Sequence, residues 1–116
     1  MKTQGLAFER AAEQCLSQAG LTLLVRNFRS RHGEIDLVML DQNTLVFVEV
    51  RQRSASRFYS AAASVSPKKQ ARLINTALCY LRQHPEHRHR YCRFDVIAYR
   101  NHMGSPLWLK SAFTTG

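Results

Sequence analysis

Two apolar segments on either side of a short polar turn constrain the fold of this chain more than any other feature. The segments are Gly33–Leu40 and Leu45–Arg51, and the residues between them, Asp41-Gln42-Asn43-Thr44, have the composition of a tight turn. A two-residue loop at Gln42-Asn43 predicts an antiparallel hairpin in which the two segments pair residue by residue away from the loop.

Apolar residues fill both faces of this hairpin, which predicts strands in the middle of a sheet that is covered on both sides. Strand alternation assigns Ile35, Leu37, Met39, Val46, Val48 and Val50 to one face and Val38, Leu40, Leu45 and Phe47 to the other.

Both segments carry carboxylates near the end remote from the turn. The register places Asp36 opposite Glu49, and Glu34 opposite Arg51. Like charges opposed on one face, with Cβ atoms about 4.5–5.5 Å apart, are destabilising unless a positive group lies between them. Asp36 and Glu49 therefore predict a divalent cation site, although either acid could instead pair with a local arginine or face water. The Glu34–Arg51 pair is interpreted as structural.

The chemistry of magnesium fits this pair of acids. Because Mg²⁺ keeps several waters and takes only one or two protein carboxylates, Asp36 and Glu49 suffice to hold Mg²⁺ or Mn²⁺, with the carbonyl of Val50 as a candidate further ligand. Arg51 follows Glu49 on the same strand face and is placed to contact a phosphate. Together these residues predict metal-dependent hydrolysis of phosphodiester bonds.

The remaining elements follow from helical spacing and strand composition. One helix is expected over Gly5–Ala19 and a second from Ser66-Pro67 to a point before Pro85. Strands are expected over Leu21–Arg29, Tyr91–Tyr99 and, last and shortest, Leu107–Phe113. The order of helix, three strands, helix and one or two strands predicts an α/β sandwich with a mixed sheet, in a single domain over residues 1–116.

The charge of the chain indicates a polyanionic partner. Seventeen Lys and Arg against eight Asp and Glu give a net charge of +9 and a pI near 10.2, which favours nucleic acid. No apolar run approaches the roughly 18 residues that a membrane span needs. The first ten residues lack the apolar core of a secretory signal, so we expect a cytoplasmic protein with no membrane association.

Basic residues near the start of the second helix and in the segment before it are candidate contacts to nucleic acid. Lysine is poorly placed at a helix N-terminus unless an anion is nearby, although a solvated polar face explains the same charge pattern equally well. His32, beside Gly33, could approach a phosphate or simply pack in its turn. The candidate contacts are Arg53, Arg57, Lys68, Lys69, Gln70 and Arg72.

Several of these motifs together resemble the bacterial YraN family over nearly the whole chain. They are Gly33-Glu34-Ile35-Asp36-Leu37-Val38, Phe47-Val48-Glu49-Val50-Arg51, Lys69-Gln70 and Arg93-Phe94-Asp95-Val96-Ile97. That family is similar in turn to the restriction-endonuclease-like superfamily, especially its Holliday-junction-resolvase branch. The resemblance implies a three-layer sandwich with a central mixed sheet of four to five strands between helices, and DNA rather than RNA as the partner.

The resemblance also implies roles for single residues. Asp36 and Glu49 become metal ligands, and Glu9 on the first helix matches an extra acid of resolvase-like relatives. Arg51 occupies the position of a catalytic lysine, and because arginine keeps its proton it can only donate hydrogen bonds and stabilise charge. Resolvase-like relatives act as dimers, which leaves a homodimer open for this chain.

The leading hypothesis is a metal-dependent nuclease or a nuclease-like DNA-processing protein. The first alternative is a noncatalytic nucleic-acid-binding module that keeps the nuclease fold, favoured by Arg51 and by the total charge. A further alternative is a scaffold that recruits protein partners through its basic face.

Overall fold

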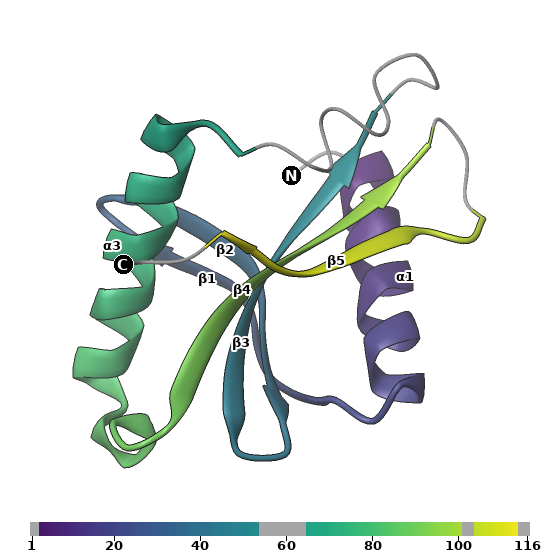
Figure 1. The fold of residues 1–116 in the computed structure, drawn as a ribbon. Coiled ribbons are helices and arrows are strands. Elements are labelled where there is room, and N and C mark those ends of the chain that lie inside the picture. The colour runs from purple at the N-terminus through teal and green to yellow at the C-terminus, as the bar shows by residue number, and fades with distance from the viewer. Residues whose placement is uncertain (1–2, 54–64, 101–103, 114–116) are drawn as a thin grey trace.

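A mixed sheet lies between two long helices in the computed structural model of the chain, which describes residues 3–53, 65–100 and 104–113 (Figure 1). Over these residues the sheet has five strands in the order β1-β2-β3-β4-β5. Its pairs are antiparallel except for β3 with β4, which run parallel. The elements are α1 (Thr3–Gln18), β1 (Thr22–Ser30), β2 (Gly33–Asp41), β3 (Thr44–Gln52), α3 (Pro67–Gln83), the 3₁₀ helix η2 (Pro85–His87), β4 (Tyr91–Tyr99) and β5 (Leu107–Phe113). The predicted order of elements and the three-layer α/β sandwich are confirmed.

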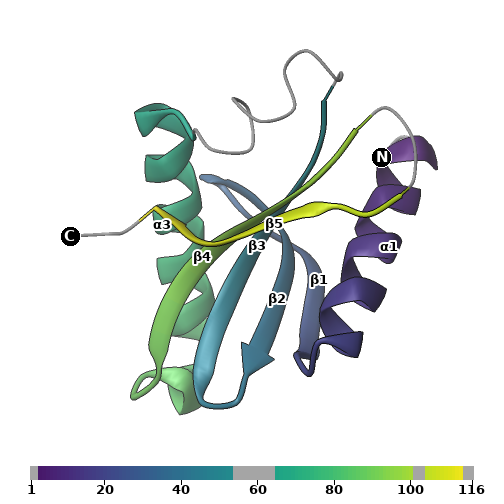
Figure 2. The same cartoon turned by 45° about the vertical axis from the view of Figure 1, so that its right-hand side comes forward.

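The two helices cover opposite faces of the sheet and create two apolar cores (Figures 1 and 2). The core beneath α1 is formed by Phe8, Ala12, Leu16, Leu21, Leu37, Met39, Val46, Val48, Ile97 and Tyr99. The core beneath α3 is formed by Ile35, Val38, Leu45, Phe47, Val65, Leu73, Ala77, Tyr80, Phe94 and Val96. Because β2 and β3 contribute to both cores, they are the central strands that their composition predicts.

The hairpin of β2 and β3 has the predicted register close to its turn. Asp41 pairs with Thr44 across the two-residue loop, where Gln42 adopts a positive φ of 54°. The ladder then runs as far as Leu37 with Val48 and ends there. The predicted pairing of Asp36 with Glu49 and of Glu34 with Arg51 is therefore wrong as strand pairing, because β2 has left β3 by that point.

The end of this ladder also corrects the predicted face of Ile35. Alternation assigns Ile35 and Leu37 to the same face, yet Ile35 packs beneath α3 and Leu37 beneath α1. The alternation of β2 is thus broken at Asp36, between them, which is the point where the strand leaves its partner.

The helix ends follow local sequence signals. Gly20, with φ of 101°, closes α1, and the N–H groups of Gly20 and Leu21 donate to the carbonyls of Ser17 and Leu16, both at 3.0 Å. At the start of α3, the Ser66 hydroxyl accepts from the N–H of Lys69 at 3.1 Å, and a proline follows the cap. Among the described residues, neither helix is long and apolar enough to cross a membrane.

Candidate functional site

The site begins where β2 separates from β3. In an unbroken ladder the N–H of Val50 would bond to the main-chain carbonyl of Ile35. Here it donates instead to Oδ2 of Asp36 at 2.8 Å. The carboxylate of Asp36 therefore replaces a missing main-chain acceptor, and this fixes the side chain at the fork between the two strands.

Two further acids meet Asp36 at this fork. One carboxylate oxygen from each of Glu9, Glu34 and Asp36 lies within 4.8 Å of the others, and we call these three residues the acid cluster. Glu9 comes from α1, whereas Glu34 and Asp36 stand two residues apart on β2. The sequence did not show that α1 aims Glu9 at the hairpin, but the structure has this arrangement.

Polar contacts from β1 hold two members of the acid cluster. Asn27, which has a positive φ of 52°, donates from Nδ2 to Oε1 of Glu9 at 2.8 Å. Nε of Arg29 lies 2.6 Å from Oε1 of Glu34. One turn further along α1 from Glu9, Glu13 accepts two hydrogen bonds from Arg26 of β1, at 2.6 and 2.9 Å, which fixes α1 against the strand. Glu34 therefore pairs with Arg29 and not with Arg51 as predicted.

The surroundings of Asp36 favour its protonated form. Burial, followed by the negative charge of Glu49, raises the pKa of Asp36 to about 8. The hydrogen bond from Val50 opposes this shift, and the charges of Glu9 and Glu34 add to it. Asp36 is therefore a carboxyl whose ionised form lacks sufficient positive charge around it.

Glu49 has different neighbours. Its side chain is buried, and Oε2 lies 3.2 Å from Nζ of Lys69 on α3 and 3.6 Å from Nε of Arg51. The charge of Glu49 is close enough to raise the pKa of Asp36, yet the acid cluster itself consists of Glu9, Glu34 and Asp36. The fork thus has an acidic side toward α1 and a mixed-charge side toward α3.

The remaining predicted contacts to nucleic acid lie at the start of α3 and at the end of β3. Lys68 and Arg72 are exposed, as is Arg53 at the end of β3. The amide of Gln70 donates to the carbonyl of Val65 at 2.8 Å, which ties it to the residues before the helix. Arg57 lies outside the described residues.

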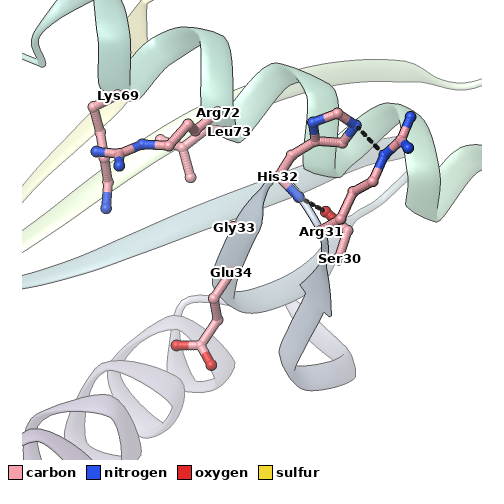
Figure 3. Close-up of a pocket in the computed structure, with 8 residues that line it drawn as sticks. All are labelled: Ser30, Arg31, His32, Gly33, Glu34, Lys69, Arg72 and Leu73. Atoms are coloured by element: carbon pink, nitrogen blue, oxygen red, sulfur yellow. Dashed lines mark hydrogen bonds between the residues drawn. The ribbon is translucent and has the colours of Figure 1, made fainter.

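A cavity of about 300 Å³ lies between the turn of β1 and β2 and the first turns of α3 (Figure 3). Lys69 and Arg72 extend from the helix side, and Arg31 and His32 belong to the turn. Figure 3 shows the carboxylate of Glu34 directed toward α1, away from the α3 wall. The cavity and the acid cluster therefore share Glu34.

Sequence reasoning missed two residues of this site. The sequence predicts a structural role for Glu34, although its position two residues before Asp36 indicates a shared strand face. The sequence predicts no role for Asn27. The only property that could indicate one is that asparagine tolerates a left-handed backbone better than most residues. The carbonyl of Val50 and the metal-binding roles of Asp36, Glu49 and Glu9 stay predictions.

The acid cluster fits a small divalent cation. Its donors are all carboxylate oxygens, the ligands that Mg²⁺ and Mn²⁺ prefer. Glu9, Glu34 and Asp36 bring their oxygens within 4.8 Å of one another, and the raised pKa of Asp36 reports the shortage of positive charge there. A cation at this place would stabilise the ionised form of Asp36 against its burial and against the charges of the other carboxylates.

The fold and these residues define a class: a basic α/β/α sandwich protein with three acids gathered at the fork of its central hairpin. Comparison with known proteins gives the family. Residues 8–99 match the model described as "Uncharacterised protein family UPF0102", so the chain belongs to this family, which confirms the resemblance to YraN.

Relatives cover almost the full chain. A UPF0102 protein of Alcanivorax borkumensis is 46% identical over 115 residues, 97% of this chain and 92% of that protein. One from Bordetella avium is 51% identical over 110 residues, 95% of this chain and 74% of that protein. One from Psychromonas ingrahamii is 42% identical over 111 residues, 96% of this chain and 89% of that protein.

Proposed function

We propose that this protein is a metal-dependent nuclease, or a nuclease-like processing protein, that acts on the phosphodiester bonds of DNA in the cytoplasm. The observation that carries the proposal is the convergence of the carboxylates of Glu9, Glu34 and Asp36 within 4.8 Å at the fork, where burial and the charge of Glu49 raise the pKa of Asp36 to about 8. The net charge of +9 favours a polyanionic substrate.

Glu9, Glu34 and Asp36 would surround Mg²⁺ or Mn²⁺, one or two of them binding the ion directly and the rest through its waters, with Glu49 and the carbonyl of Val50 as alternative oxygen ligands from the neighbouring strand. When bound, such an ion polarises a phosphoryl oxygen and lowers the pKa of its water.

Other residues of the chain orient the acids and bring positive charge to the site. The N–H of Val50 orients Asp36, and Asn27 orients Glu9. Arg51 and Lys69, both within 3.6 Å of Glu49, bring positive charge to the side facing α3, where it can stabilise the charge on a phosphate. Arginine does this as a fixed donor and lysine as a compact charge on a flexible stem.

The test is cleavage of branched, flapped and single-stranded DNA by the purified protein with Mg²⁺ or Mn²⁺, with EDTA as the metal-free control. We expect Asp36→Asn and Glu49→Gln to lose activity by about a hundred-fold or more. Asp36→Asn keeps an oxygen that can accept from Val50, so it removes the charge with little effect on the fork. Cleavage that persists in both variants would refute the proposal.

A noncatalytic nucleic-acid-binding module is the second candidate. The observation that favours it is the pairing of Glu49 with two cations of its own chain, which leaves this acid with less need of a metal ion. Salt-dependent binding of DNA that is equal with Mn²⁺ and with EDTA, without cleavage of any substrate, would support this candidate over the enzyme.

A further inference from the structure

We infer that the cavity between the β1–β2 turn and α3 is a binding site for one phosphate group, adjacent to the acid cluster. The inference rests on the proposed function for the identity of the substrate, and it assigns the place where a phosphate of that substrate is held. The residues that line the cavity are Ser30, Arg31, His32, Gly33, Glu34, Lys69, Arg72 and Leu73.

The charge of the lining selects an anion. Arg31, Lys69 and Arg72 are cationic, whereas Glu34 is the single acid among the residues that line the cavity. Glu34 is already paired with Arg29 at 2.6 Å and is directed away from the α3 wall (Figure 3). The anion therefore belongs at the end of the cavity beside Lys69 and Arg72.

The geometry of the cationic groups favours phosphate. Lys69 and Arg72 stand three residues apart on α3 and so project from the same side of the helix. A guanidinium presents paired donors that match two phosphate oxygens, and an ammonium adds a point charge. The volume of about 300 Å³ leaves room for a sugar attached to the phosphate.

The turn that forms the opposite wall is fixed to the helix. The hydroxyl of Ser30 donates to that of Thr76 on α3 at 3.2 Å, and the N–H of His32 donates to Ser30 at 3.0 Å. Gly33 has a φ of 150°, a backbone conformation that other residues rarely adopt, and a Cβ there would lie 3.6 Å from Thr76 and 3.8 Å from Arg72. The cavity is therefore formed by anchored elements, which reduces the ordering cost of binding.

The position of the cavity connects it to the proposed chemistry. Glu34 belongs to both the cavity and the acid cluster, and Lys69 belongs to the cavity and pairs with Glu49 at 3.2 Å. A phosphate held here lies beside the acids without occupying their place. This is the arrangement needed to hold a strand by a phosphate neighbouring the bond that is cut, or by a terminal phosphate.

Amide chemical shifts of ¹⁵N-labelled full-length protein, recorded in EDTA, test the inference with three probes. Inorganic phosphate tests for the oxyanion itself. Thymidine 5′-monophosphate tests for a terminal phosphate, and the dinucleotide TpT, which has no terminal phosphate, tests for an internal diester. We expect saturable shifts concentrated at residues 30–34 and 69–73, and the probe that binds more tightly identifies the source of the phosphate.

The matched variants are Arg72→Gln and Arg82→Gln, which remove one exposed arginine each from the same helix. We expect Arg72→Gln to weaken phosphate binding about ten-fold, Arg72→Lys to restore part of it, and Arg82→Gln to bind as the wild type does. Shifts spread over all basic segments, or equal weakening by Arg72→Gln and Arg82→Gln, would overturn the inference.

The two proposals fail separately. Localised phosphate binding without metal-dependent cleavage of any DNA refutes the nuclease and leaves the cavity assignment standing. Cleavage by a protein in which Arg72→Gln changes neither phosphate binding nor the shifts at residues 30–34 refutes the cavity assignment alone.

Discussion

Asp36 on β2 and Asp95 on β4 both lie within the sheet of this protein, and their neighbours differ completely. Asp95 on β4 is 1% exposed and accepts from Nε of Arg93 at 3.1 Å, from Nε1 of Trp108 at 3.0 Å and from the N–H of Ser111 at 3.0 Å. Asp36 accepts from the N–H of Val50 and is otherwise surrounded by the charges of other carboxylates.

The difference teaches that burial alone does not identify a functional acid. Asp95 receives one cationic and two neutral donors, which is how a buried charge is stabilised in a structural role. The burial of Asp36 and the carboxylates around it destabilise its ionised form. An acid kept under such conditions is a candidate for chemistry, because strongly perturbed carboxyls concentrate at functional sites.

The largest expected effect concerns Asp95. Asp95→Ala leaves three donors without their acceptor, so we expect a loss of about 3 kcal/mol in the free energy of unfolding, measured by urea denaturation. Trp108→Phe removes a single donor and should cost only about 1 kcal/mol. A loss below 1 kcal/mol for Asp95→Ala would show that the hydrogen bonds to Asp95 do not give it a structural role.

The next effect is stabilisation by a cation at the acid cluster. At a Mn²⁺ concentration about one hundred times the Kd, the free energy of unfolding should rise by about 2.7 kcal/mol. Asp36→Asn should abolish this rise, whereas Asp41→Asn, which removes an acid at the hairpin turn, should keep it. An equal response of both variants would place the ion elsewhere.

The pH dependence of stability should separate the two aspartates further. The folded-state pKa of Asp36 lies above its ordinary value of 3.8, so the folded protein binds an extra proton between about pH 4 and pH 8. Its contribution to stability is full below pH 4 and is lost as the pH rises through about 8.

The measurement compares metal-free wild type with Asp36→Asn at pH 5 and at pH 8.5. We expect the wild type to lose about 2 kcal/mol more than the variant over this range, a value below the full linkage because the carboxyl is partly exposed to water. Parallel stability curves for the two proteins would contradict the assignment.

The smallest effect on stability is expected at Asn27. Asn27→Gly keeps a backbone that tolerates positive φ and removes the hydrogen bond to Glu9, so the free energy of unfolding should fall by less than about 1 kcal/mol. The affinity for Mn²⁺ should fall about ten-fold, because Glu9 loses the contact that orients it. Calorimetric titration measures this affinity, and an unchanged value would remove Asn27 from the site.

The sequence predicted the local part of this architecture well. The turn at Gln42-Asn43 sets the register of the hairpin, and Gly20 and Ser66 mark helix ends through their own backbone and side-chain chemistry. These signals act over a few residues, so they can be recognised without knowledge of the tertiary structure. Once each segment is assigned as a helix or a strand, the order of elements along the chain follows.

The site could be predicted only in part, because it depends on contacts between distant segments. Strand alternation predicts a regular ladder, and nothing local to Asp36 signals that β2 leaves β3 there. The sequence predicts that Glu34 faces Arg51 across the hairpin, whereas its partner, Arg29, comes from β1. The approach of Lys69 to Glu49 depends on how α3 packs across the sheet, which periodicity does not specify.

Glu34 belongs both to the acid cluster, which favours a cation, and to the basic cavity, which favours an anion. A positive ion near its carboxylate makes the adjacent space more favourable for a negative group, and the reverse holds by the same factor, since linkage between binding equilibria is reciprocal. If the proposed cation and phosphate both bind, their sites are therefore coupled by charge alone, and this coupling requires no movement of the backbone.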